Sequence, residues 1–211
     1  MADDDGSGRP TLADRREVEQ VYQPAEDSRL LADSVVEHVD PGDRVLDVGV
    51  GSGYIAARAR EAGATVVGSD LNPHACRQAR EAGIPVVRGD LTTAFRADAF
   101  DLVAFNPPYL PTPPEQEWGD WMERALSGGE DGRAAVDPFL ADAGRVLTGD
   151  GAALLLVSTL TDPEAVREQA RAHGLAATEV ASESHPFEQL LVVRLTACAA
   201  RPVRDNSETL E

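Results

Sequence analysis

Lysine is absent from this chain. All 19 basic residues are arginine, and they are outnumbered by 37 acidic residues, so that the formal net charge is −18. The acids are spread along the whole chain, which favours a halophilic protein that stays soluble in concentrated salt, where screening weakens self-repulsion. An acidic surface for a basic partner is the alternative. In either case the chain lacks the basic patch typical of proteins that grip nucleic-acid phosphates.

Cysteines and long hydrophobic runs are also scarce. Cys76 and Cys198 are the only cysteines, which excludes a disulfide framework and a zinc cluster within this chain. No apolar run approaches the length of a membrane span, and Met1 leads into acidic residues rather than into the basic start of a signal peptide. We therefore expect a cytoplasmic protein. The four histidines lack the spacing of metal ligands, so no metal is expected.

The hydrophobic pattern alternates between short apolar strands and helical segments, which predicts a Rossmann-like, doubly wound α/β sheet with helices on both faces. The seven expected strands are 44–48, 65–69, 84–88, 100–105, 152–158, 175–181 and 189–195, the last two as an antiparallel pair at the sheet edge. The expected helices are 24–38, 54–62, 74–82, 133–147 and 163–174, with residues 110–132 as loop. We expect one domain over residues 21–197, between a flexible acidic tail (1–20) and a second flexible tail (198–211).

A glycine-rich turn, Gly49-Val50-Gly51-Ser52-Gly53, follows the first strand and precedes a helix, as in nucleotide-type sites. Its G-x-G-x-G spacing differs from the G-x-G-x-x-G expected for a pyrophosphate, and Asp47 just before it suits an ammonium group. Asp70 ends the second strand about 20 residues on, where an acid takes ribose hydroxyls. Asp90 ends the third strand and could reach an adenine amino group. Ordinary turn and helix-start roles are the alternative for these acids.

Asn106-Pro107-Pro108-Tyr109 directly follows the fourth strand, and the two prolines fix the backbone there. The Asn106 side-chain oxygen and the Pro107 carbonyl are both acceptors, so they could hold both hydrogens of a planar –NH₂ group against the Tyr109 ring. Such a group can break no bond by itself. It can position a nitrogen nucleophile for an electrophile that another molecule supplies. A rigid turn with an Asn cap is the alternative interpretation.

Together these motifs resemble the S-adenosylmethionine-dependent methyltransferases with a Rossmann-like fold, in the branch that methylates amino groups. The stretch Tyr22-Gln-Pro-Ala-Glu-Asp-Ser28 is similar to the Y-x-P-A-E-D-[ST] signature of the archaeal and eukaryotic HemK group, which are PrmC-related release-factor glutamine methyltransferases. The resemblance runs from about Val21 to Leu195. Val50 stands where family members often have a small residue, and we expect it to be tolerated.

The resemblance implies which residues contact S-adenosylmethionine and which hold the substrate. The implied cofactor residues lie at the glycine-rich turn and at the strand ends: Ser28, Asp47, Gly49, Gly51, Gly53, Asp70, Asp90, Leu91 and Asn106. Ser28, Asp47 and Gly49 would touch the methionine part. Asp70 would hold the ribose, and Asp90 and Leu91 would flank the adenine. Asn106, Pro107 and Tyr109 would form the catalytic group around a substrate glutamine.

The implied substrate is the glutamine of the Gly-Gly-Gln loop in the class I translation termination factor. The implied partner is a small zinc-binding activator protein that adds a strand to a sheet edge, for which residues Ile84 to Arg88 are a candidate. An ordinary edge strand blunted by Pro85 is the alternative. Alternative functions are an N6-adenine methyltransferase on DNA or RNA, a protein lysine methyltransferase, a nucleotide-binding module without catalysis, and a redox enzyme that binds NAD.

Overall fold

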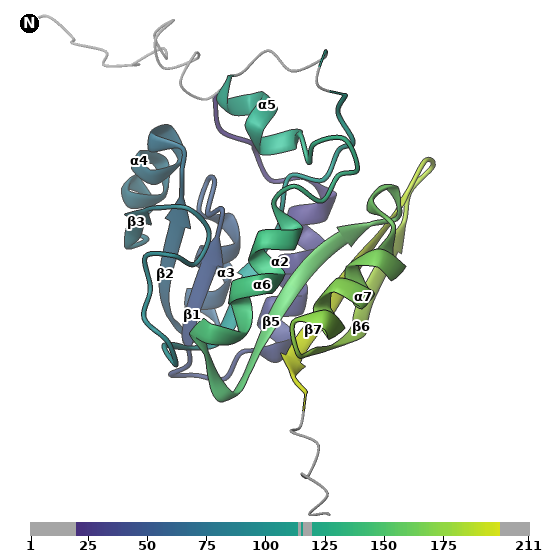
Figure 1. Ribbon diagram of the computed structural model, residues 1–211. Coiled ribbons are helices and arrows are strands. Elements are labelled where there is room, and N and C mark those ends of the chain that lie inside the picture. The colour runs from purple at the N-terminus through teal and green to yellow at the C-terminus, as the bar shows by residue number, and fades with distance from the viewer. Residues whose placement is uncertain (1–19, 114, 116–119, 199–211) are drawn as a thin grey trace, which may run out of the picture.

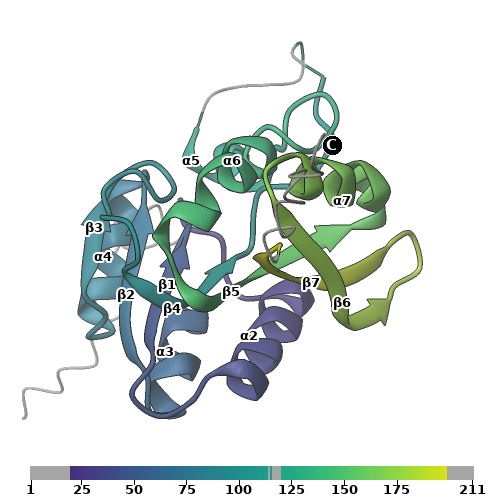
Figure 2. The same ribbon diagram turned by 60° about the horizontal axis from the view of Figure 1, so that its bottom comes forward.

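A computed structural model describes residues 20–113, 115 and 120–198, so most of both expected tails lies outside the described residues. Seven strands form one sheet with helices on both faces, which confirms the expected fold class (Figures 1 and 2). The strands are β1 (Arg44–Val48), β2 (Thr65–Asp70), β3 (Val86–Arg88), β4 (Phe100–Phe105), β5 (Leu147–Ser158), β6 (Leu175–Ser184) and β7 (Gln189–Ala197). The helices are α2 (Glu26–His38), α3 (Tyr54–Glu61), α4 (Pro73–Glu81), α5 (Trp121–Leu126), α6 (Val136–Val146) and α7 (Pro163–Ala172), with a 3₁₀ turn η2 (Thr159–Thr161).

The order of the strands is β3-β2-β1-β4-β5-β7-β6. Strands β3, β2, β1, β4 and β5 run parallel, and β7 is antiparallel to β5. Strands β6 and β7 form the antiparallel pair that the sequence predicted. The chain leaves β1 toward β2 and β3, then returns to place β4 on the other side of β1. In open α/β sheets this reversal opens a crevice at the carboxyl ends of the two central strands, and ligands bind there.

The core consists of two apolar layers that sandwich the sheet. Helices α2, α3 and α4 pack on one face, where Leu102 and Ala104 of β4 point. Helices α6 and α7 pack on the other face, where Val103 and Phe105 point. Because neighbouring residues of a buried parallel strand serve opposite faces, β4 is apolar at nearly every position. Among the described residues, no helix combines the length and the apolar character that crossing a membrane requires.

Two helices differ from the expectation. Helix α2 begins at Glu26, with Ala25 as its N-cap, so Pro24 lies before the helix and not in its first turn. The six-residue helix α5 forms within the expected loop, because the Asp120 side chain accepts the N–H of Glu123 and caps it. A helix this short gives almost no periodic signal in the sequence.

The remaining differences concern where elements begin and end. Strand β3 begins at Val86 and not at Ile84, because the Ile84 side chain is buried in the core beside α3 and α4 and Pro85 has no N–H for a ladder. Strand β5 begins at Leu147, so the expected turn 148–151 is part of it. Helix α6 is correspondingly shorter than predicted at both ends.

The glycine-rich turn packs directly on β2. Val50 is buried, and its Cγ2 lies 2.6 Å from the point where a Cβ on Gly68 would stand. The space for a branched residue in the turn therefore comes from a glycine in the neighbouring strand. This explains how the turn accommodates Val50.

The Val50–Gly68 contact makes a testable prediction. Gly68→Ala should lower the free energy of unfolding by about 1–3 kcal/mol, because the new methyl group overpacks the site. Val50→Ala in the same chain should recover most of the loss, since the two positions share one space. Urea unfolding of the two single variants and the double variant checks this, and additive losses would contradict it.

Candidate active site

A cavity of about 610 Å³ opens at the carboxyl ends of β1, β2 and β4, and α5 contributes Trp121 and Arg124 to its wall. Nine of the predicted site residues line it, namely Ser28, Gly49, Gly51, Asp70, Asp90, Leu91, Asn106, Pro107 and Tyr109. Asp47 and Gly53 are not among the lining residues. The fold thus brings together residues from five separate segments of the chain.

Asp70 both faces the cavity and shapes the glycine-rich turn. One carboxylate oxygen accepts the N–H of Gly51 at 3.0 Å, and the other accepts the N–H of Asn72 at 2.8 Å. Burial raises the pKa of Asp70, and these N–H groups oppose the rise. Gly49 and Gly51 have φ of +64° and +51°, a backbone conformation that favours glycine and that turns the chain around the cavity.

Asp47 lies behind the turn and is 1% exposed. Its Oδ2 accepts the N–H of Ala56 at the start of α3, whereas its Oδ1 has no hydrogen-bond partner among the described residues. Burial raises the pKa of Asp47 to about 7. Gly53 begins α3 with φ of +85°, and a Cβ there would touch Ile84 and Ala79. Its position therefore serves the packing of α3.

Asp90 and Leu91 follow β3 at the end of the cavity nearest that strand. The Asp90 carbonyl accepts both the N–H and the hydroxyl of Thr93, which closes a turn. Leu91 has φ of +46°, and its carbonyl accepts the hydroxyl of Ser69 on β2. The turn presents the Asp90 side chain in an exposed position and the Leu91 side chain in a half-buried one.

Asp27 is the site residue that sequence reasoning missed. It is 4% exposed, and its carboxylate accepts hydrogen bonds from the Tyr22 hydroxyl at 3.2 Å and from the Ser28 N–H at 2.6 Å. It also accepts one from Nδ2 of Asn106 at 3.2 Å. The motif contains Asp27, but an acid in the first turn of a helix also suits the helix dipole, and this local role hides a partner 79 residues away.

This network decides which way the Asn106 amide points. A carboxylate can only accept, so the NH₂ group of Asn106 must face Asp27. The hydroxyl of Ser28 lies 3.4 Å from the same nitrogen. The Asn106 Oδ1 is buried and has no partner among the described residues, which leaves it available as an acceptor beside the Pro107 carbonyl.

The phenol groups of Tyr22 and Tyr109 lie close enough to Asp27 to be influenced by its charge. Burial first, and the Asp27 charge second, raise the pKa of Tyr22 and of Tyr109 above the ordinary value. Both rings therefore remain protonated at neutral pH. Tyr109 can contribute a neutral ring and a hydroxyl to the site, but no base.

Acids dominate the charge of the cavity wall. Asp27, Asp70 and Asp90 line it, and the guanidinium of Arg124 lies 5.3 Å from the centre of the Trp121 ring. Such a wall suits a ligand that carries positive charge better than it suits a dinucleotide pyrophosphate. In the part of the chain that the structure describes, no group of histidine, cysteine and acid side chains could hold a metal ion.

Comparison with known proteins agrees with this chemistry. Residues 45–129 match the family model of a methyltransferase domain. A Methanocaldococcus jannaschii protein named as a protein N5-glutamine methyltransferase is 35% identical over 182 residues, which cover 82% of this chain and 90% of that protein. The human methyltransferase HEMK2 is 30% identical over 195 residues, which cover 83% of this chain and 89% of that protein.

The chain belongs to the HemK family of protein N5-glutamine methyltransferases. A solved structure has the same fold: a chain of the E. cuniculi Mtq2–Trm112 complex, described as responsible for the methylation of the eRF1 translation termination factor. It matches with a TM-score of 0.71 at 29% identity, over 84% of this chain and 99% of that chain. The resemblance seen in the sequence is thereby confirmed.

As a HemK-family enzyme, the protein uses S-adenosylmethionine as methyl donor. The residues of the cavity fit that molecule, which carries a sulfonium and an ammonium group. The fit rests on the acidic wall and the unpartnered oxygen of Asn106, with the buried carboxyl of Asp47 directly behind the glycine-rich turn. Membership of the family decides against the module without catalysis and against the NAD-dependent enzyme.

Asp47 predicts a pH-dependent stability. Its folded-state pKa of about 7 lies above the ordinary 3.8, so its ionisation favours the unfolded chain, and the free energy of unfolding should fall as pH rises between these values. Asp47→Asn should abolish this fall and stabilise the unliganded protein by about 1–3 kcal/mol above neutral pH. It should also weaken S-adenosylmethionine binding. Thermal unfolding across this pH range and calorimetric titration check both; unchanged stability with unchanged affinity would contradict the prediction.

Asp27 predicts a catalytic defect without a loss of fold. Asp27→Asn should slow single-turnover methyl transfer to a glutamine peptide by about 10- to 100-fold, because an amide partner no longer fixes the orientation of Asn106. Tyr22→Phe removes one donor to Asp27 but keeps the carboxylate, so it should slow transfer only a few-fold. Full activity of Asp27→Asn would show that Asn106 needs no orienting partner.

Proposed function

We propose that this protein transfers a methyl group from S-adenosylmethionine to the side-chain nitrogen of the glutamine in the Gly-Gly-Gln loop of the class I peptide chain release factor. The observation that carries the proposal is the Asn106 amide, whose nitrogen is held by Asp27 and whose buried oxygen has no partner among the described residues. With the Pro107 carbonyl it forms a pair of acceptors at the end of β4. A primary amide has two N–H donors on one planar nitrogen, and such a pair can hold both.

The proposed roles divide the cavity between cofactor and substrate. Asn106, Pro107 and Tyr109 hold the glutamine amide. Residues from the other strand ends and the helix start hold S-adenosylmethionine: Ser28, Gly49, Gly51, Asp70, Asp90 and Leu91, with Asn106 at the boundary. Asp47 and Gly53 act from behind the turn, Asp47 through its negative charge and Gly53 by allowing α3 to begin there.

The chemistry follows from the acceptors. An amide nitrogen is a poor nucleophile because its lone pair is delocalised into the carbonyl. Hydrogen bonds from its two N–H groups to Asn106 and Pro107 increase the electron density on nitrogen and fix its direction of attack. S-adenosylmethionine supplies an electrophilic methyl group when bound. The nitrogen becomes acidic once methylated, so its proton can leave afterwards and no general base is required before transfer.

We further propose a small activator protein as partner at the β3 edge of the sheet. A solved relative is a complex with Trm112. In this chain β3 is a three-residue edge strand that pairs with β2 alone, and the Val87 side chain is 38% exposed. An added strand would pair the outer backbone groups of β3 and cover this side chain. We expect that partner to bind zinc, and we place the enzyme in the cytoplasm, where termination factors act.

The deciding experiment measures transfer of labelled methyl groups to a class I release factor in concentrated salt, with and without the activator. We expect label on the intact factor and none on a factor whose Gly-Gly-Gln glutamine is changed to alanine. Asn106→Ala should lower the rate by at least about 100-fold, because it removes one of the two acceptors. Label on DNA, RNA or lysine-rich proteins, with none on the factor, would instead favour an adenine or lysine methyltransferase.

A further inference from the structure

Large hydrophobic side chains are exposed at two places on the described part of the molecule. Leu71 and Val87 lie beside the β3 edge. The other three come from segments far apart in the sequence: Leu110 is 38% exposed, Leu160 is 42% exposed and Phe187 is 94% exposed. We call Leu110, Leu160 and Phe187 the apolar rim.

Contacts bring the first two segments of the apolar rim together at Gly132. The Tyr109 carbonyl oxygen and the Thr161 Cγ2 both lie 2.6 Å from the point where a Cβ on Gly132 would stand. The backbone beside Leu110 and the Thr161 side chain beside Leu160 therefore pack against the same glycine. A side chain at position 132 would push them apart.

The third segment is joined to the second by two hydrogen bonds. The Ser158 hydroxyl donates to the Glu188 carboxylate at 2.5 Å, and the Gln189 N–H donates to the Thr159 hydroxyl oxygen at 3.0 Å. Phe187 directly precedes Glu188. The tip of the β6–β7 hairpin is thus tied to the end of β5, on the side of the molecule where the parallel strands end (Figure 1).

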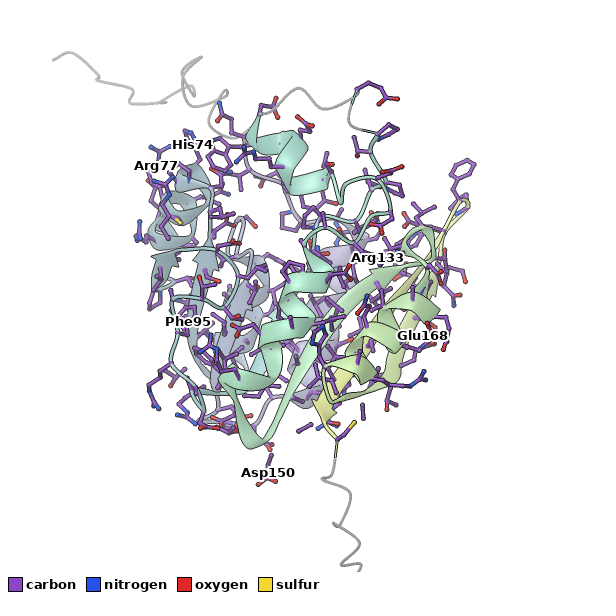
Figure 3. The ribbon with its side chains drawn as sticks, in the orientation of Figure 1. His74, Arg77, Phe95, Arg133, Asp150 and Glu168 are labelled. Atoms are coloured by element: carbon purple, nitrogen blue, oxygen red, sulfur yellow. The ribbon has the colours of Figure 1, made fainter. Side chains whose placement is uncertain are left out.

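The backbone of the apolar rim is braced from within. The His185 N–H donates to the Glu188 carbonyl across the hairpin tip at 2.8 Å. Arg133, labelled in Figure 3, donates from its guanidinium to the Thr161 carbonyl at 3.0 Å. These hydrogen bonds fix the backbone on either side of the exposed Phe187 and next to the exposed Leu160. We read these exposed apolar side chains, held on a braced backbone beside a cavity, as part of an interaction surface.

The apolar rim adjoins the candidate active site. Leu110 follows Tyr109 and itself lines the cavity. Glu188 is close enough for its charge to raise the pKa of Tyr109, after burial and Asp27. A macromolecule that inserts a glutamine beside Asn106 would therefore meet these side chains around the point of entry.

We propose that the apolar rim is the docking surface for the folded protein that carries the target glutamine, with Phe187 as the main anchor. This inference rests on the proposed function. The charges of Glu26 and Glu188 reach Tyr109 at the same entrance, so the fitting partner presents basic residues and apolar side chains beside the glutamine. A second copy of this chain would bring the same acids against the entrance, and like charges that meet at short range disfavour self-association as the use of the surface.

The test compares two substrates, the intact release factor and a short peptide that contains its Gly-Gly-Gln loop. Phe187→Ala and Leu160→Ala should each raise the KM for the factor by about tenfold, the usual effect of removing an interface anchor. Neither should change kcat/KM for the peptide, which is too short to reach the apolar rim. Phe187→Leu should keep most of the affinity for the factor. Glu168→Ala on α7, away from the hairpin tip in Figure 3, is the surface control and should change neither substrate.

The outcomes separate the two proposals. Suppose that the wild-type enzyme methylates the glutamine, and that the rim variants change the kinetics with the factor no more than with the peptide. The proposed docking surface is then wrong, and the proposed function stands. If the wild type methylates no glutamine in either substrate, both fall. If it methylates the factor but not the peptide, the dissociation constant of the factor decides, and Phe187→Ala must weaken binding by about tenfold.

Discussion

The hydrogen bond between the Asp27 carboxylate and the Asn106 amide is the interaction on which the candidate active site depends. It joins the first turn of α2 to the residue that follows β4, 79 positions later in the sequence. Without this bond the Asn106 amide could turn over and exchange the positions of its oxygen and its NH₂ group. The NH₂ group would then face the substrate, and a donor at that position cannot accept an N–H of the substrate amide. The rigid Pro107 and Pro108 fix the backbone, whereas the hydrogen-bond partners of the Asn106 side chain among the described residues are Asp27 and Ser28.

The same region contains a carboxyl group whose burial costs stability. Asp47 is buried with one oxygen unpartnered, and Asp70 is buried with both oxygens occupied by backbone N–H groups. The unliganded protein therefore carries a carboxyl whose ionised form is unfavourable, which fits the role that we propose for Asp47 toward a positively charged cofactor. Asp70 shows the opposite arrangement, because its bonds to Gly51 and Asn72 make it part of the framework that shapes the turn.

The exposed apolar side chains divide the surface between two macromolecules. The β3 edge offers unpaired strand backbone, which suits an added strand from an activator. The apolar rim offers isolated side chains around a cavity, which suits a folded substrate that inserts one residue. These surfaces lie toward opposite edges of the sheet. Strand β3 forms one edge, and the hairpin of β6 and β7 lies at the other. An enzyme with this layout can hold both proteins at once.

Much of the fold and of the candidate site could be predicted from the sequence. Local patterns predicted the sheet, its antiparallel end, the glycine-rich turn and the acids at the strand ends. They could do so because hydrophobic periodicity, glycine and proline each determine the backbone conformation nearby. They did not predict the helix α5 and the early start of β5, since a six-residue helix and a strand containing Gly149 and Gly151 give weak local signals. The family, too, was evident from the motifs. What only the tertiary structure decided was pairing at long range: that Asp27 orients Asn106, that Gly68 makes room for Val50, and that the segments of Leu110, Leu160 and Phe187 are joined to one another. Such contacts depend on how the chain folds back on itself, and a linear pattern carries no record of them.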